Sequence, residues 1–139
     1  MTYVVSGRFQ PNQVERLRKY GRRYGHTPSQ LVVYFTEEAL RKAEFSGIEF
    51  RDSSIGRIPY LTGTGLAIWE VVMIAKDYNM DAHKVAEYTQ NPIEWIKEAL
   101  AYYKKYPDNI DELVEENNSM TYEDLKKILP GLRLFKVGE

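Results

Sequence analysis

The stretch that decides the fold runs from Thr2 to Phe45: TYVVSGRFQ (residues 2–10), PNQVERLRKYGRRYG (11–25) and HTPSQLVVYFTEEALRKAEF (26–45). Its first part is rich in β-prone side chains and stops at Pro11, which predicts a short strand. A lone strand of this length is not stable. We therefore expect it to need a partner strand.

Two amphipathic helices are predicted to follow the strand. Apolar residues recur every three to four positions over residues 12–24, basic side chains fill the other faces, and Gly25 ends the helix. The segment Thr27–Gln30 then supplies a cap hydroxyl, a proline at the first helical position and a glutamine for a capping box. The second helix should run to about Phe45. We expect its buried stripe to be Leu31, Val32, Phe35, Ala39 and Ala43.

Charge is divided unevenly along this 139-residue chain, whose net charge is only −1. Residues 1–30 carry six basic groups against Glu15 alone, whereas residues 107–139 carry four basic groups against eight carboxylates. A polyanion should therefore be attracted to the N-terminal part of the chain and repelled by the C-terminal part.

The order of one short strand and two helices within about 45 residues resembles the ribbon-helix-helix DNA-binding proteins. In that family two chains pair their strands antiparallel, the ribbon enters the major groove, and the start of the second helix contacts phosphate. Alternate strand residues face opposite sides, so we expect Val5, Gly7 and Phe9 to face the core. The side chains that would project toward DNA are Val4, Ser6 and Arg8.

Within this interpretation Arg8 could bind a guanine edge with two hydrogen bonds, and Ser6 could make a weaker hydroxyl contact. Candidates for phosphate contacts are Arg22, Arg23, Thr27 and Ser29, the last two at a helix start that favours anions. The alternative is that residues 2–10 form only a dimerisation strand and that the two arginines simply stabilise a helix C-terminus. Gly7, where the family has a large apolar residue, fits that alternative.

The rest of the chain is predicted to be mainly helical, after a possible small hairpin or irregular connector over residues 48–61. Helices are expected over about 67–79, from Asp81 to Thr89, from Asn91 to before Pro107, and in two further segments, the last capped by Thr121. We divide the chain, with a seam near 46–52, into a dimerisation and DNA-binding segment (1–46), a connector (47–65), a helical domain (66–118), and a final helix and tail (119–139).

Residues 66–106 have the outline of a helix-turn-helix, which alone would suggest a second DNA reader. Their charge argues against it, because residues 66–118 carry eleven carboxylates against five lysines. We interpret this part as a structural or protein-binding module.

Residues 55–117 resemble the small helical domain of VapB-like antitoxins. The most specific pieces are Gly63-Thr64-Gly65 with Trp69, and Ala101-Tyr102-Tyr103 with Pro107. The resemblance implies an antitoxin that binds a PIN-like ribonuclease toxin and represses its own operon as a homodimer on operator DNA. The alternatives are a stand-alone DNA-binding repressor and a protein-interaction module that does not bind DNA.

The apolar tail after Pro130-Gly131 should either fold back or lie in a groove of a partner. The toxin family that the resemblance implies gathers carboxylates around metal, and an inserted Arg133 could pair with them in the metal's place. The candidate partner-binding residues are Leu132, Arg133, Leu134, Phe135 and Lys136.

Catalysis has little support in the sequence. His26 and His83 belong to no motif, the glycine-threonine-glycine turn lacks the rest of a phosphate-binding loop, and the carboxylates of residues 108–116 are typical of a solvated helix face. The chain has no cysteine, no apolar run of about 20 residues and no signal-peptide layout. We expect a cytoplasmic protein that is not an enzyme, with no cofactor, metal or membrane partner.

Overall fold

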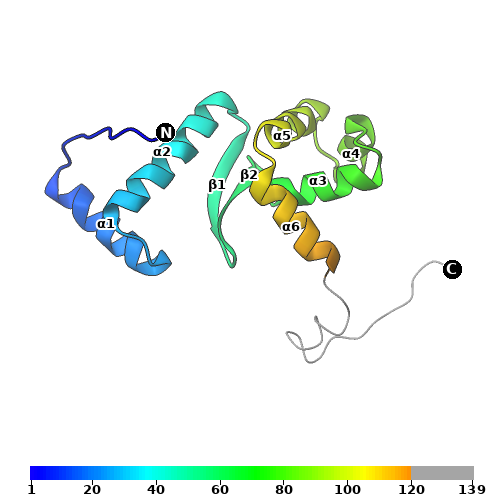
Figure 1. Ribbon diagram of the computed structural model, residues 1–139. Helices are drawn as coiled ribbons and strands as arrows, with labels where there is room; N and C mark the ends of the chain where they lie inside the picture. The colour runs from blue at the N-terminus through cyan, green and yellow to red at the C-terminus, as the bar shows by residue number, and fades with distance from the viewer. Residues whose placement is uncertain (120–139) are drawn as a thin grey trace. The chain divides into compact units, whose positions relative to one another are not determined.

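The computed structural model describes residues 1–119, which form six helices and one two-stranded sheet (Figure 1). The predicted fold class, mainly α with a small β-hairpin, is confirmed. The chain divides into two compact units, one ending at Pro59 and the other beginning at Tyr60.

Both predicted N-terminal helices are present, and α1 begins at Pro11, one residue before its predicted start. α1 spans Pro11–Tyr24 and is followed by Gly25 in the left-handed conformation, with φ of 70°. α2 spans Pro28–Glu44. Its capping box is complete, because the backbone N–H of Gln30 donates to Thr27 Oγ1 (3.2 Å) and the N–H of Thr27 donates to Gln30 Oε1 (2.9 Å).

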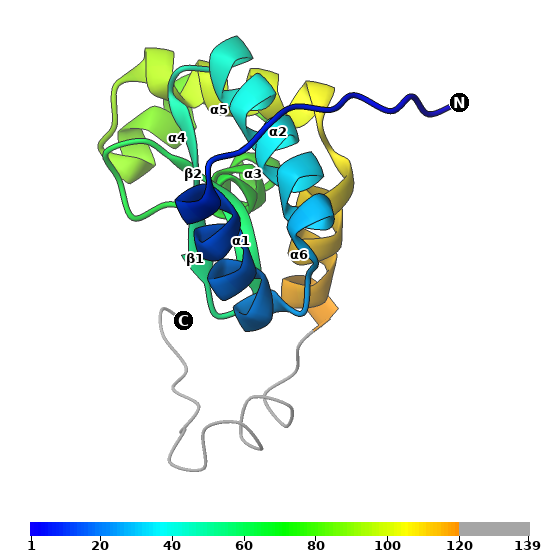
Figure 2. The same ribbon diagram turned by 90° about the vertical axis from the view of Figure 1, so that its left-hand side faces the viewer.

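Residues 1–10 form no strand in the single chain, and all of them are exposed. They leave the start of α1 as an extended segment, as Figures 1 and 2 show. Val5 is 94% exposed and Phe9 47% exposed in the single chain, so the core that they are expected to face in a paired ribbon is not formed within residues 1–119. The physical reason is the lack of any neighbouring strand within residues 1–119 to pair with this one.

The hairpin predicted as one alternative over residues 48–61 is present. β1 spans Ile48–Ser53 and β2 spans Gly56–Leu61. The turn is closed by the hydroxyl of Ser53, which donates to the carbonyl oxygen of Gly56 (2.7 Å) and accepts from the N–H of Ile55 (3.2 Å). Because β1 packs on α2, the division between the units falls after Pro59, later than the seam expected near residues 46–52.

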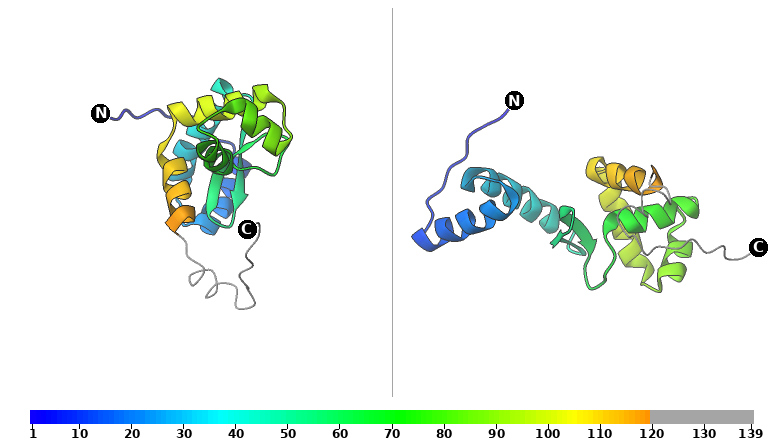
Figure 3. Two further views of the ribbon diagram at one scale, coloured as in Figure 1. Left: turned by 90° about the vertical axis from the view of Figure 1, so that its right-hand side faces the viewer. Right: turned by 90° about the horizontal axis from the view of Figure 1, so that it is seen from below.

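The second unit is a small helical bundle built around α3, which packs against the other three of its helices within the described chain (Figure 3). Its core is apolar, with Val71, Val72, Ile96 and Tyr102 fully buried. The helices are α3 (Ile68–Asp77), α4 (Ala82–Thr89), α5 (Ile93–Lys105) and α6 (Asp108–Ser119).

Two predicted caps in this unit have different outcomes. The carboxylate of Asp81 accepts from the N–H groups of His83 and Lys84, so it caps α4 as predicted. Asn91 does not cap α5, because Pro92 occupies the cap position. The side-chain amide of Asn91 donates instead to the carbonyl oxygen of Thr89 (3.3 Å).

The glycine-threonine-glycine segment is a tight turn, as its sequence predicted. Thr64 Oγ1 donates to the carbonyl oxygen of Leu61 (2.8 Å) and accepts from the N–H of Leu66 (3.1 Å). Gly63 has φ of 80°, a conformation that favours glycine. The turn brings β2 back toward the start of α3, where Tyr60 and Ala67 form an antiparallel bridge.

Gly21 is the residue that allows the α1–α2 connection to pack closely. It is buried, and a Cβ atom there would lie 2.3 Å from the carbonyl oxygen of His26 and 3.2 Å from Leu31. The carbonyl oxygen of Gly21 in turn accepts from the N–H of His26 (2.9 Å). A side chain at this position would therefore push the connection away from α1.

We expect Gly21→Ala to lower the free energy of unfolding by about 2 kcal/mol, because the overlap with a backbone oxygen outweighs the better helix propensity of alanine. Gly65→Ala is the control, since a Cβ atom there has no neighbour within 4 Å. Urea unfolding followed by circular dichroism measures both variants. Equal stability of the two variants would contradict the packing role of Gly21.

Candidate nucleic-acid and dimer interface

The predicted apolar stripe of α2 is largely uncovered in the single chain. Leu31 is buried at 2% exposure, and Val32 and Phe35 are half-buried, but Ala39 and Ala43 are exposed. The expectation of a buried stripe is therefore wrong for most of its length in the single chain, where only Leu31 of these five residues is buried.

The uncovered stripe lines an open apolar groove between α1, α2 and the end of the N-terminal segment. We call it the α1–α2 groove. Its lining residues are Phe9, Leu17, Val32, Phe35, Thr36, Ala39 and Leu40.

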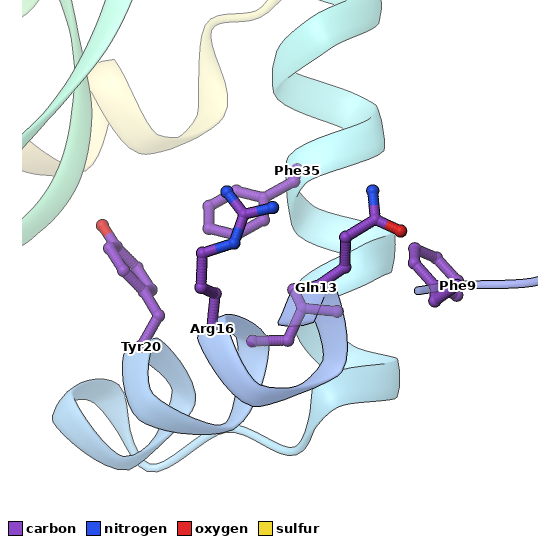
Figure 4. Close-up of a pocket in the computed structure, with 6 residues that line it drawn as sticks. Phe9, Gln13, Arg16, Tyr20 and Phe35 are labelled. Atoms are coloured by element: carbon purple, nitrogen blue, oxygen red, sulfur yellow. The ribbon is translucent and has the colours of Figure 1, made fainter. Parts of the chain in front are cut away.

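A second hollow adjoins the groove, since Phe9, Leu17 and Phe35 line both (Figure 4). Gln13, Arg16 and Tyr20 complete its lining. The first unit thus leaves an aromatic, mostly apolar surface open to solvent.

Arg57, on β2, joins three elements of the first unit through its guanidinium group. Its Nη2 and Nε contact the two carboxylate oxygens of Glu38 on α2, at 2.7 and 2.9 Å. Its Nη1 donates to the hydroxyl of Tyr20 on α1 (2.9 Å) and to Asp52 on β1 (3.1 Å). The guanidinium also lies 5.5 Å from the ring centre of Phe35, close enough for a cation–π interaction.

Asp52 is the second organising charge of this cluster. The hydroxyl of Tyr20 donates to its carboxylate, and Arg23 Nη1 lies 3.7 Å away. The hydrogen bond from Tyr20, with further contributions from Tyr24 and Arg57, lowers the pKa of Asp52 to about 2. The same carboxylate raises the pKa of Tyr24 above its ordinary value, chiefly through their hydrogen bond. Asp52 is therefore ionised and Tyr24 is protonated at neutral pH.

The basic side chains of α1 lie on its exposed face, and their partners differ. Arg18 Nη1 lies 3.9 Å from Glu15 and Arg23 Nη1 lies 3.7 Å from Asp52, and both arginines are exposed. Arg16, Lys19 and Arg22 are exposed and form no ion pair within residues 1–119.

The single chain does not bring the predicted DNA-binding residues together. Val4, Ser6 and Arg8 precede α1, whereas Arg22 and Arg23 lie in its last turn. The 14 residues of α1 separate the two groups by roughly 20 Å along the helix axis.

The start of α2 is a weaker anion site than its sequence suggested. Pro28 has no N–H, the N–H of Gln30 donates to Thr27 Oγ1, and the N–H of Leu31 donates to the carbonyl oxygen of Thr27. The capping box therefore uses the amides of Thr27 and Gln30, and Pro28 offers none to a phosphate. Of the predicted pair, Ser29 keeps an exposed position, while the side chain of Thr27 serves as the cap.

The remaining predictions concern the C-terminal tail, the two histidines, metal ligands and membrane-spanning helices. The candidate partner-binding residues of the tail, and the predicted cap at Thr121, lie outside the described residues. His26 packs against the ring of Tyr34 with centroids 4.9 Å apart, and His83 is exposed on α4. Among residues 1–119 no group of metal-ligating side chains is present, and no helix is long and apolar enough to cross a membrane.

The cluster residues Glu38, Asp52 and Arg57 were missed by sequence reasoning. They lie on α2, β1 and β2, up to 19 positions apart, and no spacing rule relates them. One sequence feature could have indicated the cluster, namely Arg57 within a short alternating strand. A charged side chain there needs an ionic or hydrogen-bonding partner once the strand is packed.

Comparison with protein-family models, with curated proteins and with solved structures found no match to this chain.

The low pKa of Asp52 predicts a specific loss of stability in acid. Because the folded pKa (about 2) lies below the ordinary value of 3.8, the carboxylate stabilises the fold above about pH 4 and loses this contribution as the pH falls toward 2. We expect the difference in unfolding free energy between wild type and Asp52→Asn to narrow by about 1 kcal/mol from pH 5 to pH 2, a modest value because solvent screens the exposed side of the carboxylate.

Urea unfolding at pH 5, 4, 3 and 2 measures this difference. Tyr20→Phe is the matched variant, since it removes the hydroxyl that lowers the pKa and should weaken the pH dependence while keeping the carboxylate. A difference between wild type and Asp52→Asn that does not change with pH would contradict the prediction.

Proposed function

We propose that the protein is a homodimeric DNA-binding regulator and acts as the antitoxin of a toxin–antitoxin pair. The observation that carries the proposal is the apolar surface left open in the first unit. An extended N-terminal segment and the α1–α2 groove lie next to each other, with Phe9 belonging to both.

The exposed residues are too apolar to remain in water as a single chain. Val4 and Val5 are 96% and 94% exposed, and Val33 and Leu40 on α2 are 68% and 55% exposed. A second copy supplies what each copy lacks, namely a strand to pair with residues 2–10 and an apolar face to cover the groove. A two-fold axis satisfies both needs with the same surface on each chain.

DNA is the partner that the charge of this unit favours. In a paired ribbon, Val4, Ser6 and Arg8 of each copy would lie side by side on one face. Such a ribbon fits the major groove, where a guanidinium can bind guanine through two hydrogen bonds. The exposed cations of α1 add a second positively charged surface for phosphate.

The antitoxin role rests on the resemblance of residues 55–117 to the helical domain of VapB-like antitoxins. In that setting the second unit and the tail would bind a PIN-like toxin, and the DNA-bound dimer would repress the shared operon. Supporting this division of labour, α6 carries five carboxylates and no basic residue within Asp108–Ser119, so the second unit is a poor surface for DNA.

The dimer is tested by a charge placed in the groove. Leu40→Glu changes a side chain that is already half exposed in the single chain, so it should leave each chain folded but separate the copies. The control is Ile55→Glu at the hairpin turn, with a similar exposure of 57%. Light scattering after size exclusion should give a monomer for the first variant and a dimer for the second. A dimeric Leu40→Glu protein would contradict the proposed interface.

Sequence-specific DNA binding is tested with Arg8→Ala. We expect the ratio of affinities for the DNA upstream of its own reading frame and for a shuffled duplex to fall about tenfold, because the variant cannot form the bidentate pair with guanine. Arg18→Ala removes the same charge at a position already beside Glu15 and should leave the ratio unchanged. Fluorescence anisotropy at fixed salt measures both. A ratio unaffected by Arg8→Ala would remove the ribbon from base recognition.

A further inference from the structure

The basic face of α1 consists of side chains in two different electrostatic situations. Arg23 belongs to the cluster around Arg57, whereas Lys19 and Arg22 stand outside it. The three residues are close in sequence and all exposed, so the sequence alone gives no reason to separate them.

The charges of the cluster balance only when Arg23 is included. Arg57 and Arg23 contribute two positive charges, and Glu38 and Asp52 contribute two negative charges. Arg57 makes its two-point contact with Glu38 and donates from Nη1 to one carboxylate oxygen of Asp52 (3.1 Å), while Arg23 Nη1 lies 3.7 Å from the other carboxylate oxygen. With Arg23 removed, the cluster would carry a net negative charge beside α1.

Lys19 and Arg22 have the opposite surroundings. They lie three positions apart, which makes them neighbours on one helix face, and neither has an acidic partner within residues 1–119. Like charges at this spacing repel each other slightly, and a phosphate backbone relieves that repulsion while releasing its own counterions.

We infer that Asp52 withholds Arg23 from polyanions, so that the phosphate backbone is bound on α1 by Lys19 and Arg22. This inference deepens the proposed DNA binding and rests on it. It replaces Arg23 by Lys19 among the phosphate ligands, and it gives the hairpin a function, because Asp52 on β1 sets how many phosphates α1 can bind.

The test uses the full-length protein and a 24-base-pair duplex of random sequence, with affinity measured by anisotropy from 50 to 200 mM KCl. Each phosphate contact contributes about 0.9 to the slope of log affinity against log salt. Lys19→Gln and Arg22→Gln should each make the slope less steep by about 0.9. Between 50 and 200 mM KCl, the affinity of each variant should therefore fall by a factor about three times smaller than that of the wild type. Arg23→Gln, the matched control on the same helix, should leave the slope unchanged.

Asp52→Asn should free Arg23 and raise the slope by the same amount, and this increase should vanish in the Arg23→Gln background. Asparagine still accepts a hydrogen bond from Tyr20, and circular dichroism checks that the variant folds. If Asp52→Asn does not fold, the comparison of the salt slopes of Lys19→Gln and Arg23→Gln decides whether the inference holds. The inference is overturned if Arg23→Gln lowers the slope as much as Lys19→Gln, or if Asp52→Asn acts equally in both backgrounds.

The duplex of random sequence keeps this test separate from the proposed function. Salt-dependent binding without any preference for the upstream DNA would contradict sequence-specific regulation and leave the inference standing. A wild-type protein that does not bind the duplex at all would overturn the inference as well.

Discussion

The first unit depends on one guanidinium group. Arg57 contacts Glu38 on α2, Tyr20 on α1 and Asp52 on β1, and its Nη2 also donates to the carbonyl oxygen of Phe50 (3.3 Å). A half-buried cation without partners would be costly, and a lysine could not reach three elements with fixed geometry. The planar fork of arginine therefore links two helices and a hairpin through one side chain.

The same residue connects this polar cluster to the apolar surface. Tyr20 and Phe35 wall the hollow beside the α1–α2 groove, and both rings lie within 6 Å of the Arg57 guanidinium. The Arg57 guanidinium thus contacts two residues that line the hollow. Within residues 1–59 the buried large apolar side chains are Leu31, Ile48 and Ile58. This core is small, so the charged cluster helps to keep the walls of the open groove in place.

The local elements could be predicted because local chemistry determines them. The capping box at Thr27, the left-handed Gly25 and the Asp81 cap each involve contacts within four residues, so their signals are contiguous in the sequence. Burial could not be predicted in the same way. The periodicity of α2 identifies an apolar face, but it does not say whether the same chain or another one covers that face.

The Arg57 cluster escaped prediction for a related reason. Its members become neighbours only after α1, α2 and the hairpin have packed. The sequence does not distinguish a charged residue that is exposed to solvent from one that joins an ion-pair network. The distinction between Arg22 and Arg23 likewise depends on Asp52, which lies 29 positions beyond Arg23 in the chain.

The cap at the start of α1 has a consequence for the register of the proposed ribbon. The N–H of Gln10 donates to Gln13 Oε1 (2.8 Å), and Pro11 fixes the next backbone angle, so the extended segment leaves α1 in a defined direction. Strand side chains alternate between faces, and a two-fold axis forces each strand to pair with itself about one central point. In the proposed ribbon, the number of residues between that point and Gln10 would decide which alternate set of side chains faces DNA. One residue more or less would turn Arg8 inward and Phe9 outward. The length of this segment, and not only its composition, therefore determines which side chains face outward from the proposed ribbon.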